Sequence, residues 1–136
     1  MSQPIAIGWE LLIGIGLAGG AGAILRFTLS RFILQHLGAT FPFGTFIVNV
    51  LGCLLFGLVW GLAENRGLLG DRARLILLVG FLGGFTTFSS FAYESLALIR
   101  DHQWGWAALN MAGQNVLGIL FVAIGIALTR IQDITP

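Results

Sequence analysis

Hydroxyl and aromatic side chains gather in one short stretch of an apolar segment, "GGFTTFSSF", residues 83–91. Side chains three and four positions apart share a face of a helix. This spacing gives two neighbouring stripes, Thr87, Ser90 and Glu94 in one, and Phe88, Phe91 and Ser95 in the other. Hydroxyl groups donate hydrogen bonds, and the rim of an aromatic ring is partially positive, so the stripes suit a small anion. Ordinary packing is the alternative interpretation of the rings.

Amide side chains in other apolar segments offer the same chemistry. Asn49 lies in one segment, and Asn110, Gln114 and Gly118 line up at helical spacing in another. Amide groups donate hydrogen bonds without carrying charge. They can replace the water that a dehydrating anion loses, and they hold the ion less tightly than an arginine would.

The glycines and threonines of the same stretch predict a break near the middle of a membrane helix. An interrupted membrane helix frees backbone carbonyl groups, which can coordinate a cation. Irregular backbone at this depth is tolerated where it is buried in protein or lines a cavity.

The sequence lacks the residue combinations that form common active sites. It contains no Ser/His/Asp set, no pair of histidines at ligand spacing and a single cysteine, Cys53, in an apolar segment. His36 and His102 fall at predicted helix ends. We therefore expect that this protein is not an enzyme.

Composition predicts an integral membrane protein. Of the 136 residues, 57% are hydrophobic and 10% are charged, against roughly 25% charged residues in soluble domains. The net charge of +1 is far from the strongly basic charge that is typical of nucleic-acid-binding proteins. The first residues, "MSQPIAIGWE", do not have the pattern of a signal peptide. We expect one transmembrane domain over residues 1–136, without a soluble part.

Long uncharged segments define the elements that position these side chains. A membrane helix needs about 20 apolar residues. Turn signals and charges divide the chain into four predicted membrane helices, at about 5–37, 43–63, 72–99 and 106–130, the third of them interrupted. The link "RDHQWGW" before the fourth helix carries two tryptophans that suit the membrane interface.

Basic residues hardly distinguish the two sides of the membrane. The side with the termini carries Arg66, Arg72, Arg74 and Arg130, and the other side carries Arg31 and Arg100, with Arg26 nearby. Orientation follows such asymmetry, so this chain is expected to insert either way up. Its 20 glycines favour close helix packing. Together these features indicate a dimer.

Three segments resemble the signature motifs of the Fluc, or CrcB, family of fluoride channels. They are "GGAGAILRF" (19–27), "FGTFIVNVLG" (43–52) and "GFLGGFTTFSSF" (80–91). Their order and spacing, the chain length and the predicted helices also fit. The resemblance covers nearly the whole chain.

The resemblance implies an antiparallel, dual-topology homodimer in the lipid bilayer, with two pores that export fluoride passively from the cytoplasm. Such a protein lowers intracellular fluoride, gives fluoride resistance and is a multi-pass protein of the cell (inner or plasma) membrane. The implied pore residues are Asn49, Phe88, Phe91 and Ser90, with Arg26 near the entrance of the vestibule. A sodium ion is implied at the dimer centre, held by the backbone carbonyls of Gly83 and Thr86.

The fourth helix departs from the family pattern. Where the family often has tyrosine, and then serine or threonine one turn later, this chain has Asn110 and Gln114. The polar line along the pore is therefore chemically altered in this protein.

Two other functions stay open at this point. A small multidrug exporter needs a membrane-embedded carboxylate, and Glu10, near the N-terminus, is the candidate on the first helix, with Glu94 towards the end of the third. A non-transporting subunit of a membrane assembly is the other, but it leaves the break and the polar stripes unexplained.

Overall fold

The computed structural model describes residues 7–130, and every regular element in that range is helical. Four helical spans are long and apolar enough to cross a membrane: Trp9–Leu37, Phe43–Glu64, Asp71–Arg100 and Trp104–Leu128. The prediction of an all-α membrane protein with four spans is confirmed. The first, second and fourth spans are the helices α1 (Trp9–Leu37), α2 (Phe43–Glu64) and α6 (Trp104–Leu128).

The third span consists of several pieces. It begins as α3 (Asp71–Leu75), continues as a π-helical segment η1 (Ile76–Leu82), and then as the short α4 (Gly83–Phe85) and the longer α5 (Phe88–Arg100). Thr86 and Thr87, between α4 and α5, have extended backbone torsions, with ψ of 157° and 109°. The Thr87 side chain caps α5 by accepting a hydrogen bond from the Ser90 N–H group at 3.2 Å. Such a cap ends the irregular segment and starts a new helix.

Some helix ends differ from the prediction. Gly8 is extended and α1 begins at Trp9, whereas the predicted start at residue 5 lies outside the described residues. Trp104 and Trp106 belong to the first turn of α6 rather than to the link before it. Their rings therefore extend from a helix end, a position that still suits the membrane interface.

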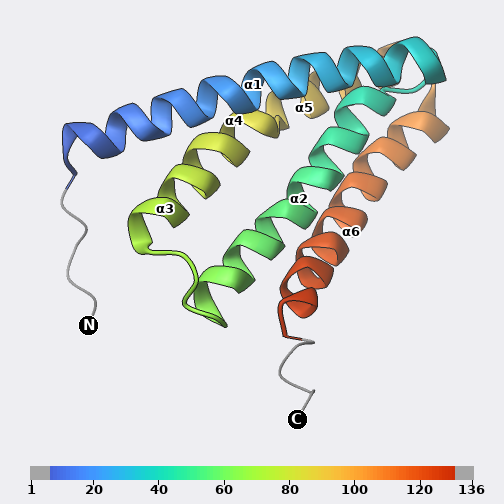
Figure 1. The fold of residues 1–136 in the computed structure, drawn as a ribbon. Helices are drawn as coiled ribbons and strands as arrows, with labels where there is room; N and C mark the ends of the chain where they lie inside the picture. Colours follow the sequence, from blue (N-terminus) through green and yellow to red (C-terminus); the bar gives the residue numbers. More distant parts are fainter. Residues whose placement is uncertain (1–6, 131–136) are drawn as a thin grey trace.

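The four spans pack as two pairs, which Figure 1 shows in one view. Helix α2 runs beside α6 in the same direction, and α1 crosses over η1 and α4. Short turns join α1 to α2 and α5 to α6 at one end of the molecule. The break between α4 and α5 consequently lies between α1 on one side and the α2–α6 pair on the other.

Glycines mark the places where these backbones meet. A Cβ atom on Gly57 of α2 would collide with the Val122 carbonyl of α6, and one on Gly125 with the Leu54 carbonyl. In the other pair, a Cβ atom on Gly84 would collide with the Gly19 carbonyl of α1. Small residues permit such close approach in lipid, which explains much of the glycine content.

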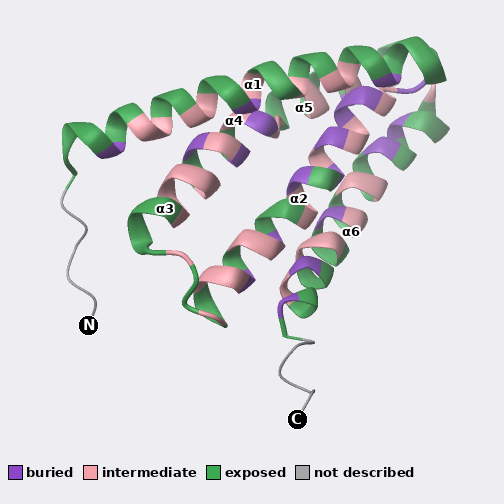
Figure 2. Ribbon diagram, in the orientation of Figure 1, coloured by how far each residue is buried: buried purple, intermediate pink, exposed green. Residues whose placement is uncertain are grey.

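The buried core is small and lies next to the break. Val48 of α2, Leu82 of η1 and Phe85 of α4 are almost fully buried and form one cluster. By contrast, much of the outer face of α1 is exposed in the single chain (Figure 2). The core thus fixes α4 against α2 and leaves large apolar faces for lipid or protein.

Candidate functional site

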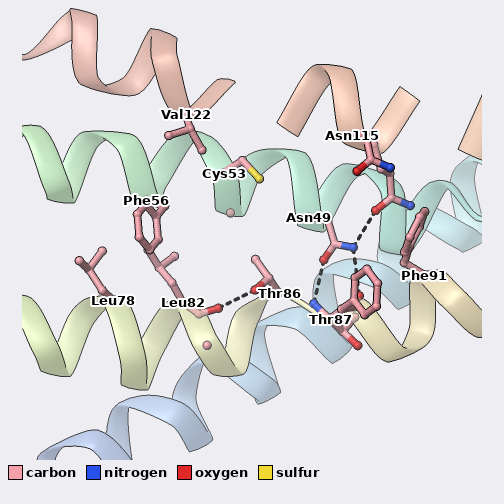
Figure 3. Close-up of a pocket in the computed structure, with 14 residues that line it drawn as sticks. Asn49, Cys53, Phe56, Leu78, Leu82, Thr86, Thr87, Phe91, Asn115 and Val122 are labelled. Atoms are coloured by element: carbon pink, nitrogen blue, oxygen red, sulfur yellow. Dashed lines mark hydrogen bonds between the residues drawn. The ribbon is translucent and has the colours of Figure 1, made fainter. Parts of the chain in front are cut away.

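A cavity of about 550 Å³ lies beside the helix break. Its walls come from α2, from the third span and from α6, and they include Asn49, Thr86, Thr87, Phe91 and Gln114. Figure 3 shows Asn49 reaching from α2 towards Thr87, with Phe91 beside them. The structure therefore brings together residues from three elements that the sequence singled out separately.

Asn49 joins α2 to the break through two hydrogen bonds. Its Oδ1 atom accepts from the Thr87 N–H group at 2.8 Å, and its Nδ2 atom donates to the Thr87 carbonyl oxygen at 3.1 Å. One amide side chain thus satisfies both backbone groups of a residue that has left the helix. Unsatisfied backbone groups are costly in a membrane, so Asn49 stabilises the break as well as lining the cavity.

A series of polar side chains continues from Asn49 across the protein. Asn49 Nδ2 donates to Gln114 Oε1 at 2.8 Å, and Gln114 Nε2 donates to Asn110 Oδ1 at 2.8 Å. Asn110 is fully buried, and its Nδ2 atom donates to Ser95 Oγ at 2.9 Å. Ser95 Oγ donates to the Phe91 carbonyl oxygen at 2.7 Å. We call these four side chains, Asn49, Gln114, Asn110 and Ser95, the amide relay.

The two predicted pore rings lie next to each other on α5. The ring centroids of Phe88 and Phe91 are 5.5 Å apart, with an interplanar angle of 48°. Both rings line the cavity, and Phe88 is 79% exposed in the single chain. Beside the rings, Thr87 Oγ1 and Ser90 Oγ are hydrogen-bonded at 3.0 Å. Rings and hydroxyls therefore share the first turn of α5.

A carboxyl group in the third span has a polar partner that the sequence analysis did not identify. Thr45 Oγ1 of α2 donates to Glu94 Oε1 of α5 at 2.6 Å. The other carboxyl oxygen, Glu94 Oε2, is buried and has no hydrogen-bond partner in the described part of the chain. Helical spacing placed Glu94 in the stripe with Ser90, but Thr45 is 49 positions away in the sequence, and no local pattern joins the two.

Some backbone carbonyl oxygens at the break accept hydrogen bonds, and others have no donor within the described residues. The Leu82 oxygen accepts from the Thr86 N–H and hydroxyl groups, both at 2.9 Å. Arg26 Nε of α1 donates to the Gly84 oxygen at 3.1 Å. Within residues 7–130, the hydrogen bonds at the break leave the carbonyl oxygens of Gly83 and Thr86 without a donor.

The candidate carboxylate on the first helix for a drug exporter, Glu10, lies in the first turn of α1. The Glu10 side chain is 93% exposed and forms a salt bridge of 3.7 Å with Arg72. Glu10 is not among the residues that line the cavity. This position gives no support to a role in proton-coupled exchange.

Known proteins match this chain over most of its length. The sequence profile of the family described as "CrcB-like protein, Camphor Resistance (CrcB)" matches residues 13–126. A curated protein of Nitrosococcus oceani, named "Fluoride-specific ion channel FluC", is 46% identical over 123 residues, which cover 90% of this chain and 98% of that protein.

Relatives in other bacteria carry the same name. The protein of Solidesulfovibrio magneticus is 47% identical over 122 residues, covering 90% of this chain and 98% of its own length. The protein of Chloroflexus aurantiacus is 43% identical over 119 residues, which cover 88% of this chain and 94% of that protein. The similarity extends over the helices that build the cavity and the break.

Proposed function

The chain belongs to the CrcB-like family of membrane proteins, and from this premise we propose that it conducts fluoride selectively and passively. It is a multi-pass membrane protein, and its curated relatives are named fluoride-specific ion channels. The observation that carries the proposal is the juxtaposition at the cavity. Uncharged donors and two aromatic rings converge on a broken helix, where a small anion can exchange its water for ring edges and hydroxyl groups.

A passive channel explains why fluoride leaves the cell. Hydrogen fluoride crosses a membrane as a neutral weak acid and releases its proton in the less acidic cytoplasm. The fluoride ion is then trapped, because an ion crosses lipid poorly. A selective path through the protein lets the ion move out down its gradient and lowers intracellular fluoride.

Fluoride release from proteoliposomes tests this function. We expect rapid fluoride release and retention of chloride when no pH gradient is applied, because the site offers donors but the described cavity offers no fixed positive charge that would hold any halide. Ion-selective electrodes measure both anions in the same sample. Equal release of the two anions, or release that requires a proton gradient, would contradict a selective channel.

Two copies of the chain, arranged antiparallel, complete the pore in this proposal. The ring of Phe88 is 79% exposed in the single chain, and Gly83 is exposed as well. A pore-lining ring must be enclosed by protein to strip water from an ion, so a second chain is needed to cover this face. The near-equal distribution of arginines across the membrane supports opposite orientations.

A sodium ion at the dimer centre fits the available carbonyl groups. The oxygens of Gly83 and Thr86 have no donor within the described residues, and oxygen ligands without protons suit a hard cation. The ion would supply positive charge at the break and hold the two chains together. Replacing sodium with potassium during purification should lower the melting temperature of the dimer, because a ligand bound to the folded state stabilises it. An unchanged melting temperature would contradict the cation site.

A further inference from the structure

The hydrogen bonds of the amide relay all run in one direction. The Thr87 N–H group can only donate, so the oxygen of the Asn49 side chain must face it. The Asn49 nitrogen is then left to face Gln114, which must present its own oxygen. The same requirement passes from Gln114 to Asn110 and on to Ser95. One backbone group at the helix break therefore fixes the orientation of every amide in the relay.

The relay begins and ends on one short piece of backbone. It starts at the N–H group of Thr87 and returns to the carbonyl oxygen of Phe91. This piece is the cap and first turn of α5, which carry both rings. The relay therefore ties the ring-bearing turn to α2 through Asn49 and to α6 through Asn110 and Gln114.

Asn49 has no amide hydrogen to spare in this arrangement. Its nitrogen carries two hydrogens, and these serve the Thr87 carbonyl oxygen and Gln114 Oε1. Its oxygen accepts from the Thr87 N–H group. Gln114 also cannot turn its amide round without placing its nitrogen against the Asn49 nitrogen, where two donors would face each other.

We propose that Gln114, Asn110 and Ser95 are positioning residues that act on the fluoride path through Asn49 and the first turn of α5. This inference rests on the proposed function and concerns how the same site is held. Gln114 sets the orientation of Asn49, and Asn110 and Ser95 set the orientation of Gln114. The fluoride ion meets the turn that the relay holds, and the relay amides donate to one another.

The competing possibility is that each amide is a separate fluoride ligand along the path. The two possibilities differ in how substitutions combine. Independent sites contribute additively to the free-energy barrier, whereas members of one network do not. If Gln114 acts through Asn49, its replacement loses its effect once Asn49 has been removed.

A double-mutant cycle, measured as fluoride release from proteoliposomes, distinguishes the positioning role from separate binding of fluoride by each amide. We expect Gln114→Met, which keeps the size of the side chain but removes both hydrogen bonds, to slow fluoride release roughly tenfold. Asn49→Ala should slow it by at least as much. The combined variant should match Asn49→Ala alone within about twofold. Multiplication of the two single effects would overturn the positioning role.

A matched control variant distinguishes loss of the positioning role from a general loss of folding or activity. Thr28→Val removes a hydroxyl that donates only to carbonyl groups of its own helix, those of Ile24 and Leu25, and should leave release unchanged. Each variant is compared at equal amounts of folded dimer in the membrane. If Gln114→Met does not fold, Ser95→Ala replaces it in the same cycle with Asn49→Ala, with the same expectation and the same contradicting result.

This cycle is independent of the test of the function itself. Loss of selectivity in the unmodified protein would refute the proposed function before any variant is compared. A selective unmodified protein whose Gln114 variant keeps the full rate would refute the relay alone.

Discussion

Replacing Phe88 or Phe91 with isoleucine slows fluoride release by about tenfold or more while the dimer stays intact. Isoleucine fills a similar apolar space but has no ring edge with partial positive charge to face an anion. Each rise of about 1.4 kcal/mol in the barrier slows passage tenfold. Because both rings lie on the first turn of α5, we expect both single variants to show the loss. Electrode-monitored release from proteoliposomes measures it.

Phe32→Ile is the matched control for the ring variants. The Phe32 ring packs on His36 of its own helix, with centroids 4.3 Å apart, and Phe32 is not among the residues that line the cavity. Its replacement should leave the release rate unchanged. Full activity in both Phe88→Ile and Phe91→Ile would mean that the anion path lies elsewhere.

Variants of the chain that insert in a single orientation should each lose fluoride release, and two variants of opposite orientation expressed together should recover it. Lysines added near His102 should place that turn on the cytoplasmic side, and lysines added near Gly67 should place the opposite loop there, because positive loops stay inside. An antiparallel dimer needs both orientations, so each variant alone should release almost no fluoride. Expression of the two together should recover release.

The orientation of each lysine variant must be measured beside its activity. Labelling of cysteines introduced into the two loops reports which side each loop occupies. Strong fluoride release from a variant with a proven single orientation would contradict the antiparallel arrangement.

The helical scaffold follows from features that the sequence displays locally. Uncharged segments of membrane length predicted the four spans, because charges and turn residues separate them. The run of Gly83, Gly84, Thr86 and Thr87 predicted irregular backbone, because glycine and β-branched residues weaken a helix. In the structure, Thr86 and Thr87 are extended.

The partners within the site could not be predicted from local patterns. Asn49 bonds to residues 38 and 65 positions away, and Arg26 bonds to a carbonyl group 58 positions away. Such contacts depend on how α1, α2 and α6 cross, and close glycine contacts set those crossings. The sequence identified residue types that suit an anion but did not show that their donors serve one another.

The reversal potential across a planar bilayer tests selective fluoride conduction most directly. Fluoride is set tenfold higher on one side, and chloride makes up the difference, so that total halide is equal and both sides have the same pH. A fluoride-selective channel gives a reversal potential close to the fluoride equilibrium value, about 59 mV in magnitude. A reversal potential near zero, or no current without a proton gradient, would contradict the account.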